Sequence, residues 1–507
     1  MSRKTIITGT IILTTANLIT RCMGFFNRVY LSNAIGAEGI GLYQLILPVY
    51  GLAWSITSAG FTTAISHLTA QEHIKGQKGN IIRIVRQAVF LSLGISLCIA
   101  ILLFFCSENI SCSILKDNRA SYPLQLLAFA IPFMTMGSCL RGFFIGLQES
   151  SIPAISQVLE QTVRILTVYI LADLFVPFGL TYACITAVAG IVCGEFISCC
   201  FTLWNYNHYK KKHVFIQRST ISSYSALKMV LSMAVPLSAA RISSSLLSTI
   251  ENLMIPQQLQ RYGQNTAQAL ATYGELTGMA LPLLMLPSAC LMAASVSLVP
   301  EISEANAISQ HHRIKRTVSA VFLFTSIIGF GAVAFFAVFP KEICYVVYNR
   351  PSLGNVLFPM AFHCPLLYAQ TTLSGLLNGL GKQFFLFWNS ILSSVISIAI
   401  IWFFMPLYGI PAFLFGWFLS LLFSVGNSLF LLWKQTKALP SFYNCFLKPL
   451  LAGAAAGLLV KYLIRISEPS KLLFLCSLAG TGVLYIFFLF ILGCLSRKEL
   501  YFLFGKK

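Results

Sequence analysis

The sequence is short of charge. Only 10% of its 507 residues are Asp, Glu, Lys or Arg, whereas 57% are apolar and the mean hydropathy is +0.79. A soluble globular domain carries roughly a quarter of charged residues. This deficit excludes a soluble enzyme, a disordered chain and a disulfide-stabilised scaffold. The apolar residues form repeated runs of membrane-spanning length, so the composition indicates a polytopic membrane protein.

Sequence motifs for metal binding and for hydrolytic chemistry are also missing. The fifteen cysteines include no C-x-x-C pair and no Cys/His spacing typical of metal ligands, and most lie in apolar runs as small buried hydrophobes. Neither H-E-x-x-H nor G-x-S-x-G occurs. We therefore expect no enzyme activity, no cofactor and no metal.

Fourteen apolar segments are long enough to cross a bilayer as helices, the structure that backbone amides require in lipid. They fall near residues 5–32, 40–69, 84–107, 122–147, 153–175, 179–203, 226–256, 268–299, 317–339, 354–378, 384–405, 409–433, 440–464 and 471–495. The predicted fold is an all-α membrane protein of about fourteen transmembrane helices. Most connections are short, so no soluble domain is inserted.

The distribution of the net charge of +20 orients these helices. With the N-terminus inside, 21 Lys and Arg fall on the cytoplasmic side and 7 on the outer side. Such a bias sets the orientation of membrane proteins. We expect a multi-pass protein of the cell membrane with both termini in the cytoplasm. Nucleic acid is not expected as a partner, because no basic stretch lies on a soluble module.

The two halves of the chain resemble each other at an offset of about 230 residues. Residues 177–204 match 406–433, and residues 83–86 match 313–316. Two similar six-helix bundles of the same orientation are therefore predicted, and such parallel repeats surround a midplane cavity in secondary transporters. The predicted division is an N-terminal lobe at 1–215, a C-terminal lobe at 216–438 and two further helices with a basic tail at 439–507, the lobes being related by a pseudo-two-fold axis along the membrane normal.

Charged residues inside the predicted helices are candidates for function, because each costs at least roughly 2.5–3.5 kcal/mol at the bilayer centre. Arg21 and Arg28 share one helix face, and Arg241 begins a polar stripe on the repeat-related helix. Arg141 lies about two turns from a cytoplasmic end, which its side chain could reach. The predicted cavity residues are Arg21, Arg28, Arg241, Asn17, Ser245, Glu251, Asn252 and Glu275.

Glu160 and Arg164 are four residues apart and are expected to form an ion pair. The pair is either a buried structural bridge or part of an inner cavity.

A cavity rich in arginine suits a ligand that carries phosphate, because guanidinium binds phosphate oxygens at two points and does not deprotonate. An exporter of organic cations would instead need carboxylates in the first helix. The first predicted helix has none before Glu38.

Several stretches resemble the sporulation members of one transporter family. They are Ile19–Arg21, Ile35–Tyr43, Leu253–Pro256, Tyr273–Ala280 and Leu298–Ser303. The family is the polysaccharide transporter branch of the multidrug/oligosaccharidyl-lipid/polysaccharide flippase superfamily. The resemblance implies a twelve-helix core of two lobes, alternating access, and a role in peptidoglycan synthesis for the spore cortex.

Lipid II flippases of the same superfamily have cavity arginines in the first helix, and Arg21 and Arg28 resemble them. Those flippases also carry an arginine in the second and in the eighth helix. Here the second predicted helix has no arginine and the eighth carries Glu275.

The leading hypothesis is a flippase for an undecaprenyl-pyrophosphate-linked saccharide such as a peptidoglycan precursor. Arg21, Arg28 and Arg241 would neutralise the pyrophosphate, while Asn17, Ser245 and Asn252 would contact the sugar. Its partners would be this lipid, the phospholipid bilayer and enzymes of cell-wall synthesis. Two alternatives are a cation or drug antiporter with Glu160, Glu251 or Glu275 as its proton-coupled site, and a membrane scaffold for cortex synthesis that transports nothing.

Overall fold

The computed structural model describes residues 3–213, 219–289, 310–437, 441–464 and 471–494, together with Leu291 and Ile302. Over these residues the chain is helical, without strands. Ten helical segments of the described part are long and apolar enough to cross a membrane. The predicted all-α polytopic class is therefore confirmed. Each predicted span has a helical counterpart, although the latter part of the span at 268–299 lies outside the described residues.

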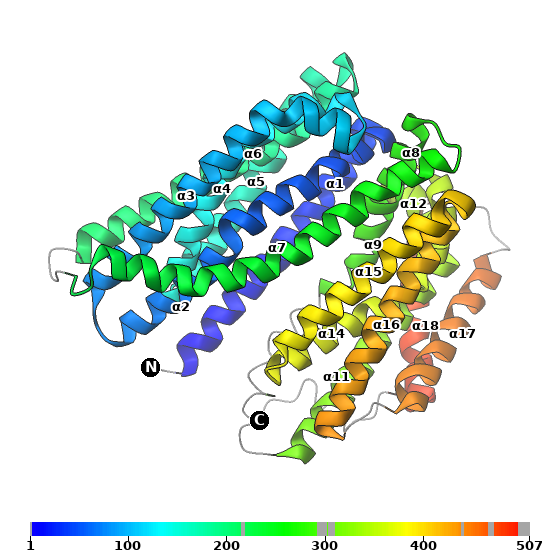
Figure 1. Cartoon of the computed structure of the whole chain (residues 1–507). Coiled ribbons are helices and arrows are strands. Elements are labelled where there is room, and N and C mark those ends of the chain that lie inside the picture. Colours follow the sequence, from blue (N-terminus) through cyan, green and yellow to red (C-terminus); the bar gives the residue numbers. More distant parts are fainter. Residues whose placement is uncertain are drawn as a thin grey trace. The chain divides into compact units, whose positions relative to one another are not determined.

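Contacts divide the chain into a first unit, Met1–Gly274, and a second unit, Glu275–Lys507. The helices of the first unit are α1 (Arg3–Trp54), α2 (Gly60–Ile74), α3 (Lys78–Asn109), α4 (Ser121–Gly146), α5 (Ser151–Phe175), α6 (Leu180–His213), α7 (Ser223–Arg261) and α8 (Thr266–Tyr273), as Figure 1 shows. The second unit contains α9 (Leu281–Met285), α11 (His311–Val338), α12 (Pro340–Tyr348), α13 (Gly354–Ala361), α14 (Cys364–Gly379), α15 (Gln383–Tyr408), α16 (Ile410–Thr436), α17 (Lys448–Ile464) and α18 (Lys471–Ile491).

This division follows packing rather than the internal repeat. Helix α7 packs on α1, α2 and α3, and α8 packs on α1, so both belong to the first unit. The lobe boundaries predicted at 215 and 438, and the pseudo-two-fold axis, follow the repeat and stay predictions.

Helix α1 contains the first two predicted spans in part, separated by a break at Gly36. The backbone there has φ 74°, a left-handed conformation that glycine adopts without steric cost. The second arm of α1 continues through a π-type turn, Ser55–Ala59, into α2. The break therefore gives α1 two arms, and residues of both arms line one cavity, as described below.

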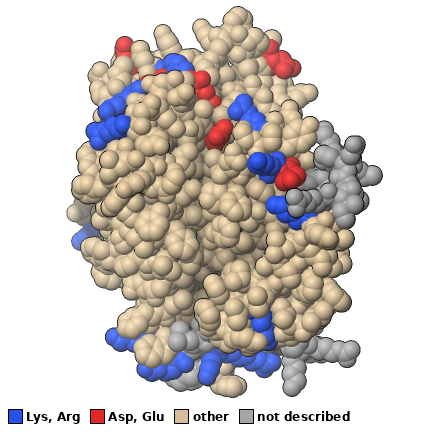
Figure 2. Space-filling model, turned by 90° about the vertical axis from the view of Figure 1, so that its right-hand side faces the viewer, with Lys and Arg blue, Asp and Glu red and all other residues tan. Residues whose placement is uncertain are grey.

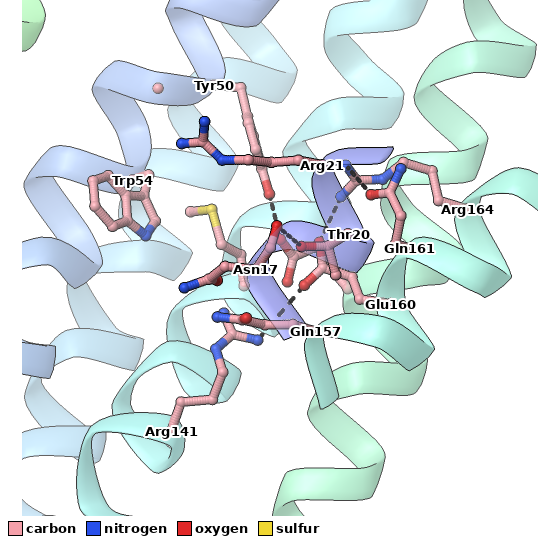
Figure 3. A pocket seen from close by; sticks show the side chains of 13 residues that line it. Asn17, Thr20, Arg21, Tyr50, Trp54, Arg141, Gln157, Glu160, Gln161 and Arg164 are labelled. Atoms are coloured by element: carbon pink, nitrogen blue, oxygen red, sulfur yellow. Dashed lines mark hydrogen bonds and ion pairs between the residues drawn. The ribbon is translucent and has the colours of Figure 1, made fainter. Parts of the chain in front are cut away.

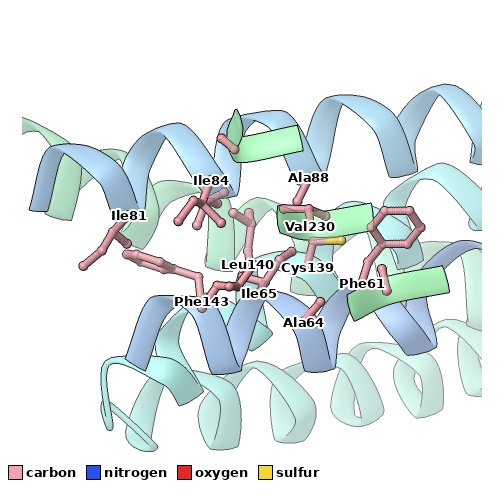
Figure 4. Close-up of a cluster of buried hydrophobic side chains, with 14 of the residues drawn as sticks. Phe61, Ala64, Ile65, Ile81, Ile84, Ala88, Cys139, Leu140, Phe143 and Val230 are labelled. Carbon is pink, nitrogen blue, oxygen red and sulfur yellow. The ribbon is translucent and has the colours of Figure 1, made fainter. Parts of the chain in front are cut away.

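The core of the first unit lies where α2, α3, α4 and α7 meet (Figure 4). Ile65, Ile84, Phe143 and Val230 contribute one side chain from each of these helices, and all four are fully buried. Lipid is as apolar as these side chains, so close packing rather than transfer out of water stabilises this contact.

The outer surface of α3 is apolar, in contrast to that of a soluble protein. Phe90 and Phe105 are 77% and 76% exposed. Across the face drawn in Figure 2, most of the visible surface carries no charged side chain. Exposed phenylalanines of this kind face lipid in a membrane protein, which agrees with the predicted class.

Glycines allow the backbones of α1 and α8 to lie close together. A Cβ atom on Gly41 would lie 1.9 Å from the carbonyl oxygen of Leu270, and one on Gly274 would lie 2.2 Å from that of Ala37. Small residues allow membrane helices to pack backbone against backbone. Both glycines belong to the stretches that carry the family resemblance, and the contact gives them a physical reason.

In the second unit the last two helices pack on α11. The Tyr485 hydroxyl of α18 donates a hydrogen bond to the carbonyl of Ile327, at 2.7 Å. The Tyr485 ring lies 3.0 Å from where a Cβ on Gly331 would be. Helices α17 and α18 therefore brace α11.

The contact between α1 and α8 predicts that Gly41→Ala destabilises the protein. Its Cβ atom meets backbone, which cannot rotate away, and overpacking of this kind costs about 1–3 kcal/mol. The thermal unfolding midpoint of the purified protein in detergent should fall. Gly94→Ala on α3 is the matched control, because a Cβ there meets nothing within 4 Å. Equal midpoints for the two variants would contradict the close packing.

Candidate functional site

A cavity of about 550 Å³ lies in the first unit, lined by residues of α1, α4, α5 and α6 (Figure 3). Both arms of α1 contribute to it, because the break at Gly36 returns the chain to the same depth. Asn17 and Arg21 come from the first arm and Tyr50 and Trp54 from the second. Each pair is four residues apart and so shares one helix face. We call this space the charged cavity.

Helix α5 supplies the centre of the charged cavity. One face of the helix carries Gln157, Glu160, Gln161 and Arg164, all of which line the cavity. The Arg164 Nη2 atom lies 2.6 Å from Glu160 Oε1, so the predicted ion pair is present. The pair lines the cavity, and whether its role is structural or in ligand binding stays a prediction.

Glu160 also forms an ion pair with a second arginine. The Nη1 atom of Arg141 on α4 lies 3.7 Å from Glu160 Oε2. Arg141 further donates hydrogen bonds to the hydroxyls of Ser138, at 2.9 Å, and Ser198, at 3.1 Å. Its side chain is 14% exposed and lines the cavity.

Helix α6 contributes a second carboxylate, Glu195. Gly190 and Gly194 allow α6 to lie against α5, because a Cβ on Gly194 would be 2.8 Å from the carbonyl oxygen of Glu160. Glu195 is buried at 5% exposure, and its Oε1 atom accepts a hydrogen bond of 2.6 Å from the Tyr50 hydroxyl. The cavity thus contains three arginines and two carboxylic acids.

Arg21 differs from the other two arginines of the cavity. Within the described part of the chain its guanidinium forms neither a hydrogen bond nor an ion pair. Figure 3 shows the group directed away from Glu160 and Arg164. An exposed cation that lines a cavity without a counter-charge is available to an anion.

Three buried polar atoms of this region also have no partner in the described residues. They are Oε2 of Glu195, Nε of Arg164 and Oε1 of Gln157. Buried polar atoms are nearly always paired with protein or water, so these positions call for water or a ligand. In the described part of the chain, no group of three or more His, Cys, Asp or Glu could hold a metal ion.

A second cavity of about 260 Å³ lies beside the second arm of α1, between that arm, α7 and α8. Its lining contains no charged residue; the residues are Gln44, Leu47, Pro48, Gly51, Ser245, Ser248, Thr249, Asn252 and Tyr273. Gly51 lines both cavities. We call this space the neutral cavity.

The structure groups six of the residues predicted from the sequence. Asn17, Arg21, Glu160 and Arg164 line the charged cavity, and Ser245 and Asn252 line the neutral one.

The other four predicted residues line neither cavity. They are Arg28, Arg241, Glu251 and Glu275. Arg241 is exposed on α7, and the other three are half-buried. Their roles stay predictions.

Sequence reasoning missed Tyr50 and Glu195. Glu195 had a signal, because an acidic residue inside an apolar run is a functional candidate by the same criterion that singled out Glu160. Tyr50 had none, since only the fold brings its hydroxyl to Glu195. Arg141 was noticed, but its position in the cavity depends on the packing of α4 against α5 and α6.

Comparison with known proteins identifies relatives that cover most of the chain. A family model described as polysaccharide biosynthesis protein matches residues 6–306. Stage V sporulation protein B of Bacillus subtilis (strain 168) is 31% identical over 405 residues, which cover 79% of this chain and 78% of the relative. Lipid II flippase MurJ of the same organism is 23% identical over 436 residues, which cover 79% of this chain and 76% of the relative.

Among solved structures, lipid II flippase MurJ in an inward closed conformation is similar, with a TM-score of 0.71 at 15% identity. The match covers 95% of this chain and 98% of the other. The two share their fold. Together with the sequence matches, this confirms the resemblance to the sporulation members of the polysaccharide transporter branch.

The ion pairs of Glu160 predict that Glu160→Gln lowers stability. The amide keeps the volume of the side chain but removes the carboxylate that forms ion pairs with Arg141 and Arg164, and breaking a buried pair costs roughly 3 kcal/mol. The unfolding midpoint in detergent should fall clearly below that of Glu149→Gln, which changes an exposed residue. If the two variants unfold at the same temperature, Glu160 does not hold the cavity together.

Proposed function

Because the chain belongs to the polysaccharide biosynthesis protein family, we propose that it is a flippase for a lipid-linked saccharide that carries a pyrophosphate. The head group enters the first unit, its phosphates meet the arginines of the charged cavity, and the lipid tail stays in the bilayer. Alternating access then exposes the head group on the other side of the membrane. No covalent bond changes, so the protein is a transporter and not an enzyme.

The observation that carries this proposal is the unpaired guanidinium of Arg21. Guanidinium matches two oxygens of a phosphate at once and stays charged at any physiological pH. Arg21 lies in a cavity with two further arginines. A carboxylate or a sulfate would meet the same charge, but the named activity of a relative, lipid II flipping, favours a lipid pyrophosphate.

Arg141 and Arg164 form a second layer around the ligand. Both are paired with Glu160, so they add positive charge to the cavity without being free to move. With both carboxyl groups ionised, the three arginines exceed the acids by one charge. This excess attracts an anion and disfavours an organic cation, which argues against the antiporter.

The membrane potential supplies a driving force for this cargo. We place the protein in the cell membrane with both termini in the cytoplasm, following the bias of Lys and Arg. Moving about two negative charges outward is then favoured by up to ~4.6 kcal/mol per 100 mV. The cargo we propose is a peptidoglycan precursor similar to lipid II, used in the spore cortex, where enzymes of cell-wall synthesis would take it over. The sporulation relative supports this setting.

Replacing Arg21 tests the proposal. In Arg21→Ala, binding of lipid II should weaken by about tenfold to a hundredfold, because a hydrogen bond to a charged group contributes about 1.5–3 kcal/mol. Native mass spectrometry of the purified protein with lipid II measures this directly. Arg21→Lys should give an intermediate value, since it keeps the charge and loses the two-point geometry.

Arg86→Ala is the control, because Arg86 is exposed on α3 and lines neither cavity. A flipping assay in proteoliposomes should rank the variants in the same order. Unchanged binding and flipping by Arg21→Ala would refute the assignment of Arg21 and turn attention to the antiporter or the scaffold.

A further inference from the structure

The end of α16 and the start of α17 form a basic and aromatic surface on the second unit. Both lie at the same end of that unit in Figure 1, and the orientation proposed above places this end in the cytoplasm. Residues 438–440 lie outside the described residues, but the chain from Lys437 to Ser441 spans at most about 14 Å. The two helix ends therefore belong to one surface, which we call the interfacial patch. Its residues are Trp433, Lys434, Lys437, Phe442, Tyr443, Phe446 and Lys448.

The interfacial patch is positively charged and has no acid near it in the sequence. Between Glu342 and Glu468 the chain contains neither Asp nor Glu, so no carboxylate of α13 to α17 can neutralise the lysines. Lys434 and Lys437 are exposed, and neither forms an ion pair within the described residues. Unpaired lysines at a membrane surface attract anionic headgroups, which the cytoplasmic leaflet supplies.

Aromatic rings position two of the lysines. The Nζ atom of Lys437 lies 5.0 Å from the centre of the Trp433 ring, and that of Lys448 lies 5.1 Å from the centre of the Tyr443 ring. A ring face attracts an ammonium group without cancelling its charge. The two cations are therefore held at the surface while their charge stays available to a ligand.

The backbone of Lys437 adopts a conformation that is unusual for lysine. Its φ of 52° is left-handed, and its amide donates a hydrogen bond of 2.8 Å to the carbonyl of Trp433 at the end of α16. Glycine or asparagine usually occupies this position, because a Cβ atom crowds the backbone there. A side chain kept in a disfavoured conformation indicates a function. A lysine at this place also meets the negative end of the α16 dipole, a structural role that the test below separates from ligand binding.

Exposed aromatic side chains give the interfacial patch an apolar part. Phe442 is 70% exposed and Tyr443 is 59% exposed. Phe442 stacks on Phe446 with ring centroids 4.9 Å apart, and Phe446 packs edge to face on Phe330 of α11 at 5.0 Å. The rings are thus fixed to the unit while much of their surface remains open. Aromatic residues of this kind favour the boundary between lipid headgroups and acyl chains.

We propose that the interfacial patch binds an anionic phospholipid of the cytoplasmic leaflet, separately from the cargo of the charged cavity. Lys434 and Lys437 contact the phosphate of the headgroup, while the rings of Trp433, Phe442 and Tyr443 contact the glycerol and the adjoining acyl chains. A soluble anion would use the lysines alone and leave the exposed rings in water, so the chemistry of the patch fits a lipid. The bound lipid links α16 to α17, one of the two helices that brace α11.

Lipid binding to the full-length protein in a neutral detergent tests the proposal. By native mass spectrometry, phosphatidylglycerol should bind more tightly than phosphatidylcholine, whose headgroup has no net charge. In Lys437→Asn the affinity for phosphatidylglycerol should fall about fivefold, the contribution of one lysine near an anionic membrane surface. The affinity for phosphatidylcholine should not change. Lys437→Arg keeps the charge and should bind both lipids as wild type does.

The unfolding midpoint separates lipid binding from a structural role. Asparagine tolerates the left-handed backbone, so Lys437→Asn without lipid should unfold at or above the wild-type midpoint. A lysine that only stabilises the end of α16 predicts a lower midpoint and unchanged lipid binding. Lys210→Asn is the matched control, because Lys210 is an exposed lysine near the end of the repeat-related helix α6. Its affinity for phosphatidylglycerol should equal that of wild type.

A photoreactive phosphatidylglycerol locates the bound lipid and should cross-link within residues 433–448. The inference is wrong if the cross-links fall elsewhere, if wild type binds the two phospholipids equally, or if Lys437→Asn retains the wild-type affinity. Equal losses in Lys210→Asn and Lys437→Asn would show a diffuse attraction and no site. Displacement of the lipid by inorganic phosphate would show that phosphate alone is the ligand. Neither lipid II nor Arg21 enters the experiment, so its result does not depend on the proposed function.

Discussion

The charged cavity depends on the ion pairs that Glu160 forms with two arginines. An ionised group inside a membrane needs a counter-charge or a water-filled cavity within the protein, because the surrounding lipid supplies neither. Glu160 meets this need for Arg164 on its own helix and for Arg141 on α4. Two cations on neighbouring helices can therefore lie side by side at the centre of the first unit. Without the carboxylate between them, their repulsion and desolvation would push α4 and α5 apart.

The glycines make this electrostatic centre possible. Gly190 and Gly194 let α6 approach α5 closely enough for Glu195 to reach the cavity and accept a hydrogen bond from Tyr50. Apolar side chains are as stable against lipid as against another helix, so close backbone contact is what distinguishes one helix arrangement from another. The charged cavity thus depends on the close helix packing that these glycines allow.

The sequence predicted the membrane class and the helices well, because hydropathy reflects a requirement that lipid imposes on every span. It also predicted the pair of Glu160 and Arg164, because four residues of one helix return to the same face. It could not predict contacts between helices. The burial of Arg141 and Glu195 in the cavity depends on which helices are neighbours. Likewise, α7 and α8 pack on α1, so the first unit ends at Gly274 and not at the repeat boundary predicted at residue 215.

The difference between Arg21 and the paired arginines fits a transporter better than a permanent binder. A carrier must bind its cargo strongly enough to extract it from one side and weakly enough to release it on the other, as conduction through a selective pore also requires. Three unpaired guanidinium groups would hold a pyrophosphate too tightly. Glu160 forms ion pairs with two of them, so Arg21 is the one guanidinium of the cavity that has no partner among the described residues and can recognise the anion. The cargo then gains its remaining specificity from uncharged contacts, which can form and break without a large electrostatic penalty.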